Sequence, residues 1–82
     1  MNQIRIQNMV LGMVATNCYL LQNPETKEMI IVDPADNADA IERKINALEG
    51  IPVAILLTHG HFDHILAATT LQKKYRISVY AF

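Results

Sequence analysis

The residues of this chain that could do chemistry are concentrated in one stretch, Thr58-His59-Gly60-His61-Phe62-Asp63-His64. It holds all three histidines of the protein, with an aspartate among them. Imidazole and carboxylate groups together suit zinc, iron or manganese. Alternate residues of an extended segment point the same way, so His59 and His61 can reach one ion. Asp63 and His64 lie beyond a bend, where they can face a second ion. The stretch therefore predicts a metal site.

The spacing of these ligands resembles a known signature. His59-x-His61-x-Asp63-His64, directly after an apolar run ending at Thr58, looks like the signature of the metallo-β-lactamase superfamily. Upstream, Thr16-Asn17-Cys18-Tyr19-Leu20 and Ile31-Val32-Asp33-Pro34 resemble segments of its glyoxalase II-like hydrolases. The resemblance runs through essentially all 82 residues, in order, but matches the first part of such a domain. It implies one partial α/β (α+β) domain over residues 1–82, the N-terminal half of an αββα sandwich without its C-terminal half.

The resemblance also implies a reaction. His59 and His61 would bind the first metal, and Asp63 and His64 the second, with one or two zinc ions and with iron or manganese as alternatives. In that family a metal-bound hydroxide attacks a carbonyl carbon, and Asp63 could orient the hydroxide as a catalytic residue. The expected partner is a small-molecule thioester, such as an S-acylglutathione, or an ester. β-Lactamase, lactonase, nuclease and persulfide-oxidising activities stay open within the superfamily.

One departure from the family pattern leaves the activity open. The family completes its site with later histidine and aspartate ligands, whereas this sequence has no His, Asp or Glu after His64. We therefore expect a truncated hydrolase that is weakly active or inactive. The alternative is a non-catalytic metal-binding or self-associating module that needs a second chain to complete the site. A third possibility is an α/β fragment that binds no metal.

Composition narrows the class of protein. A length of 82 residues allows one small domain, and 51% hydrophobic with 18% charged residues is a globular composition. The formal net charge of −1 suggests neither a nucleic acid nor an anionic membrane as partner. One cysteine excludes an internal disulfide. Without a signal-peptide pattern or an apolar run of membrane-spanning length, we expect a cytoplasmic location.

The elements that must position the histidines can be read from the apolar pattern. Residues 1–32 predict an antiparallel β-meander, with a hairpin turn at 23–27. Residues after 37 predict a helix capped by Asn37 or Asp36, with Gly50 at its left-handed C′ position. A fully apolar strand over 53–57, a helix over 65–75 and a strand over 77–80 follow.

The second half of the chain is thus a β-α-β-α-β alternation, which predicts parallel strands and right-handed crossovers. The histidines then follow the carboxyl end of a buried strand, where open α/β sheets bind ligands. Asp33 is either a turn residue or an acceptor that orients a ligand histidine. Cys18, within an apolar run, is expected to be buried and inert.

A last strand that stops near residue 82 would leave one sheet edge and one broad sheet face uncovered. Exposed apolar surface of this kind drives association. We therefore expect the chain to self-associate or to pair with a complementing C-terminal half.

Overall fold

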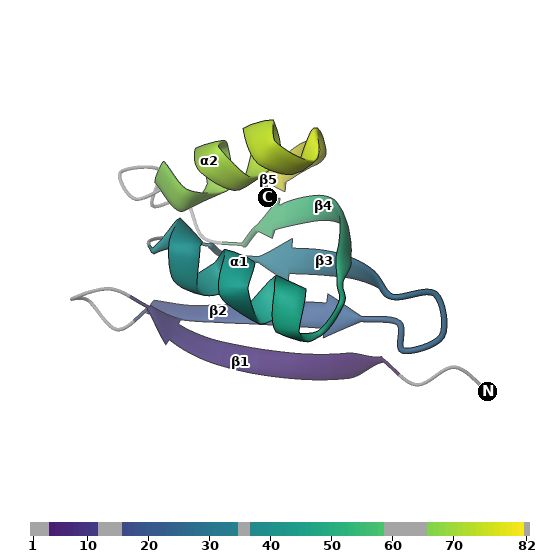
Figure 1. Cartoon of the computed structure of the whole chain (residues 1–82). Helices are drawn as coiled ribbons and strands as arrows, with labels where there is room; N and C mark the ends of the chain where they lie inside the picture. Colours follow the sequence, from purple (N-terminus) through teal and green to yellow (C-terminus); the bar gives the residue numbers. More distant parts are fainter. Residues whose placement is uncertain (1–3, 12–15, 35–36, 59–65, 82) are drawn as a thin grey trace.

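The computed structural model of the chain describes residues 4–11, 16–34, 37–58 and 66–81. Their elements, in order, are β1 (Arg5–Leu11), β2 (Thr16–Gln22), β3 (Glu28–Val32), α1 (Ala38–Ala47), β4 (Ile51–Leu57), α2 (Leu66–Tyr75) and β5 (Ser78–Ala81). The strands form one five-stranded sheet in the order β1-β2-β3-β4-β5 (Figure 1). The mixed α/β architecture is the one that the sequence predicts.

The first half is the expected meander, because β1 pairs with β2, and β2 with β3, in antiparallel register. The turn between β2 and β3 is built on Asn23. Its side-chain oxygen accepts from the amides of Glu25, at 2.9 Å, and Thr26, at 3.3 Å. Asn favours such turns because its short side chain can bond backbone groups two or three residues on. The predicted hairpin is confirmed.

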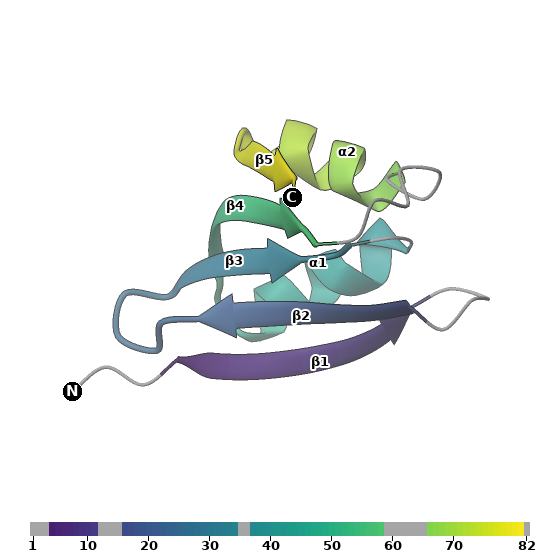
Figure 2. The same ribbon diagram turned by 180° about the vertical axis from the view of Figure 1, so that it is seen from behind.

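The second half winds β3-α1-β4-α2-β5, with β3, β4 and β5 parallel. Both helices lie on the same side of the sheet (Figure 1). Seen from behind, the sheet lies in front of α1 (Figure 2). This arrangement follows from right-handed crossovers that continue in one direction along the sheet. No helix in the described part of the chain has the length and apolarity that a membrane crossing requires.

Helix α1 begins as the sequence predicts and ends differently. The side-chain oxygen of Asn37 accepts from the amide of Ala40 at 3.3 Å, which confirms Asn37 as the N-cap. At the other end, Gly50 donates to the carbonyl of Ile45 at 2.8 Å, the 6→1 bond of a Schellman motif. The residue with left-handed backbone is Glu49, at φ 54°. The prediction that Gly50 occupies C′ is therefore wrong by one residue.

Gly50 has a packing role instead. A β-carbon built at this position would lie 2.5 Å from Cε and 3.1 Å from Sδ of Met29. Met29 is fully buried, so its side chain has little room to withdraw. The absence of a side chain at Gly50 thus lets the end of α1 approach β3 closely.

The hydrophobic core lies between the sheet and the two helices. Its buried members alternate along the strands and recur along the helices: Cys18, Leu20, Met29, Ile31, Ile41, Ile45, Ile55, Ala67, Ala68 and Leu71. The expectation that the fourth strand is of the kind buried inside a sheet holds in part. β4 does lie between β3 and β5, but Ile51 and Val53 are 54% and 42% exposed. Both residues lie in the first part of β4, where the pairing with β3 shifts register between Met29 and Ile30 and skips Val53.

Candidate functional site

The carboxyl ends of β3 and β4 form the sheet edge to which the sequence assigns the chemistry. Thr58 follows β4 directly and is the last described residue before the histidine stretch. The predicted ligands His59, His61, Asp63 and His64 lie outside the described residues, so their grouping around a metal stays a prediction. The structure shows how Thr58, the residue immediately before that stretch, is held at the end of β4.

Asp33, which follows β3, holds Thr58 through hydrogen bonds. Its carboxylate accepts from the backbone amide of Thr58 at 2.7 Å and from the Thr58 hydroxyl at 2.5 Å. Its own amide donates to the carbonyl of Leu56 at 2.8 Å. Because hydrogen bonds to a charged group are stronger than neutral ones, the carboxylate holds Thr58 firmly in place. The residue that precedes His59 is thereby tied to the neighbouring strand.

The strand register explains why these two residues meet. Val32 lies opposite Leu56 in the parallel pair of β3 and β4, so Asp33 and Thr58 follow their strands at the same sheet edge. Asp33 then leaves the strand with a left-handed backbone, φ 54°. Aspartate adopts this conformation more readily than most residues. The turn aims its carboxylate across to β4.

The nearby cysteine is buried, and its thiol resists deprotonation. Cys18 is fully buried, and burial, with a smaller effect from the negative charge of Asp33, raises the pKa of its thiol from 9.0 to about 12. Since the thiolate is the reactive form, the thiol stays protonated at neutral pH. The prediction of a buried and inert cysteine is confirmed in its burial, and the raised pKa agrees with its inertness.

The structure resolves the two interpretations of Asp33 in part. Asp33 does end a strand in a turn, and its carboxylate also acts as an acceptor, toward Thr58. Whether it also orients a ligand histidine concerns residues beyond those described. Sequence reasoning treated Thr58 as a strand-end residue and missed the bond. The available signal was an Asp and a Thr that follow adjacent parallel strands.

Within the described ranges, no three His, Cys, Asp or Glu residues come together as a metal-binding group. Among the described residues, Asp33 and Thr58 are the ones that lie next to the predicted metal site. The prediction of its ligands depends on the sequence alone.

Comparison with known proteins identifies the family. The family model of the metallo-β-lactamase superfamily matches residues 11–82, so the chain belongs to this superfamily. The chain is 40% identical over 63 residues to the "Probable polyketide biosynthesis zinc-dependent hydrolase BaeB" of Bacillus velezensis, covering 77% of this chain and 28% of that protein. It is 36% identical over 74 residues to the "Probable metallo-hydrolase YqgX" of Bacillus subtilis, covering 90% and 34% of the two chains.

A solved structure agrees. The crystal structure of the B3 metallo-β-lactamase BLEG-1 superposes with a TM-score of 0.84 at 39% identity, covering 93% of this chain and 36% of that one. The fold is therefore part of the metallo-β-lactamase fold, as the resemblance implies. The chain spans about a third of the length of the relatives it matches, since it covers 28% of one and 34% of the other.

Proposed function

We propose that this chain carries the histidine-rich half of a zinc-dependent hydrolase site that cleaves thioesters or esters in the manner of glyoxalase II. The observation that supports this most directly is the bond pair between Asp33 and Thr58. It joins the carboxyl ends of two parallel strands one residue before the predicted ligands begin. A site of this kind needs its ligands on a rigid base, because small displacements weaken metal binding and catalysis.

The donor set fits zinc. Three imidazoles and one carboxylate within six residues are nitrogen and oxygen ligands of the types that zinc accepts. In the proposal His59 and His61 hold one ion, and Asp63 and His64 hold a second. Zinc bound there would supply Lewis acidity and would lower the pKa of water toward neutrality. The role of Asp33 is to position: through Thr58 it fixes where the ligand-bearing segment starts.

The preference for thioesters and esters rests on the sequence resemblance of two segments, one around Cys18 and one around Asp33, to glyoxalase II-like hydrolases. The names of the relatives point the same way at a coarser level, toward zinc-dependent hydrolases. A B3 metallo-β-lactamase shares the fold, so cleavage of a β-lactam amide is the activity to compare against.

A second candidate is a metal-binding module without activity of its own. The ligand count of the histidine stretch favours it: four ligands shared between two ions give two each, whereas a catalytic zinc normally has three protein ligands plus water. With two ligands for each ion, binding would be weaker than in a complete site, and a second chain could supply the remaining ligands.

Metal content and thioester cleavage, measured on the same preparation, distinguish the candidates. The purified chain is stripped with a chelator, dialysed against zinc and analysed for zinc per chain. Hydrolysis of an S-acylglutathione is followed by the release of thiol. Cys18 is buried and adds little background to a thiol reagent. The matched variants are His59→Ala and His61→Ala for the site and Gln72→Ala, on the exposed surface of α2, as the control.

The two hypotheses predict different results. The leading proposal expects bound zinc and slow thioester cleavage, both lost in the histidine variants and retained in Gln72→Ala. Bound zinc without cleavage supports the metal-binding module. A chain that binds no zinc contradicts both.

A further inference from the structure

Helix α2 follows the predicted metal ligands as closely along the chain as β4 precedes them. Its first residue, Leu66, comes two positions after His64. Because neighbouring Cα atoms are only about 3.8 Å apart, a shift at the start of α2 is passed on to the backbone that carries Asp63 and His64. At the other end of the stretch, Thr58 is held to β3. The placement of α2 therefore bears on the last two ligands.

Alanine occupies the two buried positions in the first turn of α2. Ala67 and Ala68 are each 3% exposed and belong to the core with Ile41 of α1 and Ile55 of β4. Leu71, three and four positions later, lies on the same side of the helix and is fully buried. The buried side chains of α2 are thus small where the helix is nearest to the predicted ligands and large one turn later.

Small side chains allow the start of α2 to approach its neighbours closely. The helix contacts α1, β4 and β5, and it lies beside α1 on one side of the sheet (Figure 1). Protein interiors are close-packed, so a larger side chain in the first turn must push the helix away or distort its surroundings. The two alanines therefore set how near the first turn lies to α1 and β4.

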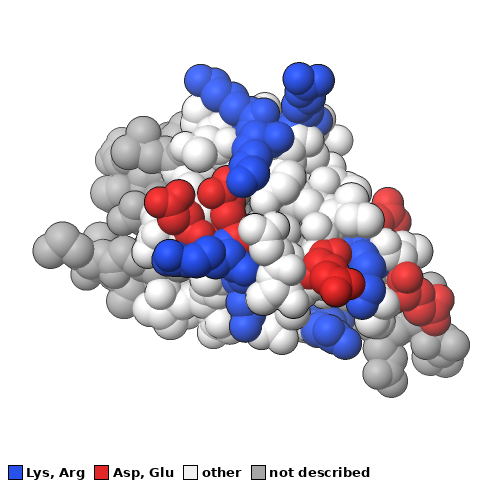
Figure 3. Space-filling model, viewed as in Figure 1, with Lys and Arg blue, Asp and Glu red and all other residues white. Residues whose placement is uncertain are grey.

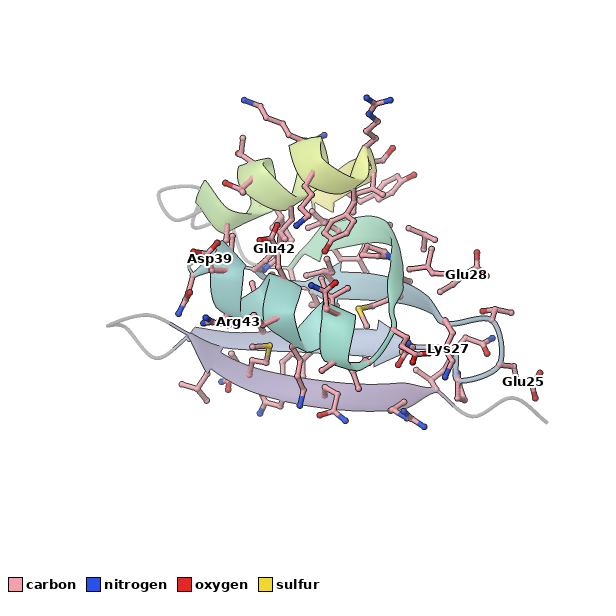
Figure 4. The ribbon with its side chains drawn as sticks, viewed as in Figure 1. Glu25, Lys27, Glu28, Asp39, Glu42 and Arg43 are labelled. Carbon is pink, nitrogen blue, oxygen red and sulfur yellow. The ribbon has the colours of Figure 1, made fainter. Side chains whose placement is uncertain are left out.

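The last turn of α2 is tied to α1 separately. Nζ of Lys74 lies 3.0 Å from Oε1 of Glu42, which sits on the side of α1 nearer to α2 (Figure 4). Other charged side chains spread over the outer surface of the helix side (Figure 3), and the buried residues of α2 are uncharged. Because its far end is held, added bulk in the first turn should displace mainly that turn, the one next to His64.

We propose that Ala67 and Ala68 are positioning residues for the second of the two ions, the one assigned to Asp63 and His64. This inference rests on the proposed function, because it takes from there the binding of two zinc ions. The hydrogen bonds at the end of β4 position the start of the ligand stretch, and the two alanines position its end through α2. The two ions then depend on separate parts of the fold.

The proposal predicts that one ion is weakened and the other is not. Ala68→Val adds two methyl groups to the buried side of α2, and it should raise the Kd of the second ion by about 10- to 100-fold, the range typical of changes in groups that orient metal ligands. The first ion, assigned to His59 and His61, should bind as in the unchanged chain. Thr69→Val places the same side chain at the adjacent exposed position and should retain both ions.

Zinc binding to the chelator-stripped chain tests the proposal. Zinc per chain is counted by elemental analysis after dialysis at a free zinc concentration that saturates the unchanged chain, and circular dichroism verifies that each variant is folded. Ala68→Gly weakens the helix but keeps the position small, so it should retain both ions. A purely structural role would instead make the loss of zinc follow the loss of stability. Ala68→Ser, which adds one atom, replaces Ala68→Val if the latter does not fold, with an effect in the same direction.

Double variants identify the ion that is weakened. In the Ala68→Val background, His64→Ala should lower the zinc count no further, because the second ion is already lost. His59→Ala in the same background should remove the remaining ion. Loss of the remaining ion through His64→Ala would overturn the proposal.

Three further results would overturn the inference and leave the hydrolase proposal standing. One is a chain that cleaves the thioester with a single bound zinc, since α2 then has no second ion to position. Another is Ala68→Val with both ions bound at unchanged affinity. The third is an equal weakening of both ions by Ala68→Val and Ala68→Gly. A chain that binds no zinc contradicts the proposed function itself, and the inference with it.

Discussion

The carboxylate of Asp33 accepts both the amide and the hydroxyl of Thr58, 25 residues further along the chain. The bonds join the carboxyl ends of β3 and β4 at the edge where the predicted ligands begin. Asp33 also has a left-handed backbone, φ 54°. This position therefore needs both a residue that tolerates a positive φ and a side chain that accepts hydrogen bonds. Substitutions can separate the backbone requirement from the hydrogen bonds.

Asp33→Gly and Asp33→Asn should give different losses of stability. Both residues tolerate a positive φ, but only Asn retains a side-chain acceptor. We expect Asp33→Gly to lower the free energy of unfolding by about 1–3 kcal/mol more than Asp33→Asn does, the cost of losing hydrogen bonds to a charged group. Urea denaturation measures both.

Thr58→Val supplies the second side of a double-mutant cycle with Asp33. It removes the hydroxyl and keeps the shape and the amide, so we expect a loss of about 1 kcal/mol. In the Asp33→Gly background the same change should cost clearly less. Additive losses would show that the two side chains do not interact. If the bond pair supports the metal site, Asp33→Gly should also weaken zinc binding.

Gly50→Ala should destabilise the protein through a clash with Met29. The new methyl group would lie 2.5 Å from Met29 Cε, so the buried methionine must shift. Overpacking of this kind costs about 1–3 kcal/mol. Met29→Ala removes the obstacle, so Gly50→Ala should cost less in that background. An equal cost in both backgrounds would contradict the contact.

Glu49→Gly is the matched control at the adjacent position. Glu49, not Gly50, has the left-handed backbone, and glycine there removes the strain of a side chain at positive φ. We expect the free energy of unfolding to change by about +0.5 to +1 kcal/mol, a stabilisation. A loss of stability would contradict the placement of C′ at Glu49.

The Cys18 thiol should make stability depend on pH in the alkaline range. Its pKa is raised from 9.0 to about 12, so above pH 9 the unfolded chain loses a proton that the folded chain keeps. Stability contributed by this group is complete below pH 9 and falls by up to about 1.4 kcal/mol for each pH unit toward 12. Cys18→Ala should fall less steeply between pH 9 and 10.5. If the free energy of unfolding of Cys18→Ala falls with pH as steeply as that of the unchanged protein, the raised pKa of Cys18 is refuted.

Gln22 is a buried amide, and reversing its donor role should be costly. Its Nε2 donates to the carbonyl of Leu48 at 3.0 Å and lies 3.4 Å from that of Lys27. Gln22→Glu sets a carboxylate against two carbonyl oxygens. We expect a loss of about 3–5 kcal/mol at pH 7, well above the roughly 1–3 kcal/mol expected for Gln22→Met.

The Gln22→Glu loss should shrink in acid. Burial raises the pKa of a carboxyl group, so stability is retained below the unfolded value of about 4.3 and is lost as pH rises through the folded value. Denaturation at pH 4 and pH 7 tests this. A loss that is the same at both pH values, with Gln22→Met as reference, would show that size and not charge is responsible.

The sequence alone determined the order of strands and helices, the antiparallel first half and the parallel second half. It also placed the N-cap at Asn37 or its neighbour Asp36, and the structure selects Asn37. These features depend on apolar periodicity and on side chains that bond within a few residues, which a single chain displays directly. The local sequence pattern also predicts His59, His61, Asp63 and His64 as metal ligands. Measuring the zinc bound per chain would test that prediction.

Tertiary structure decided what depends on residues far apart in the sequence. The bond between Asp33 and Thr58 exists because two parallel strands end side by side. The close contact at Gly50 is with a methionine in another strand and does not arise from the helix end that the sequence suggested. Tertiary structure also placed α1 and α2 on the same side of the sheet, because an apolar strand has the same sequence pattern whether one of its faces or both are covered.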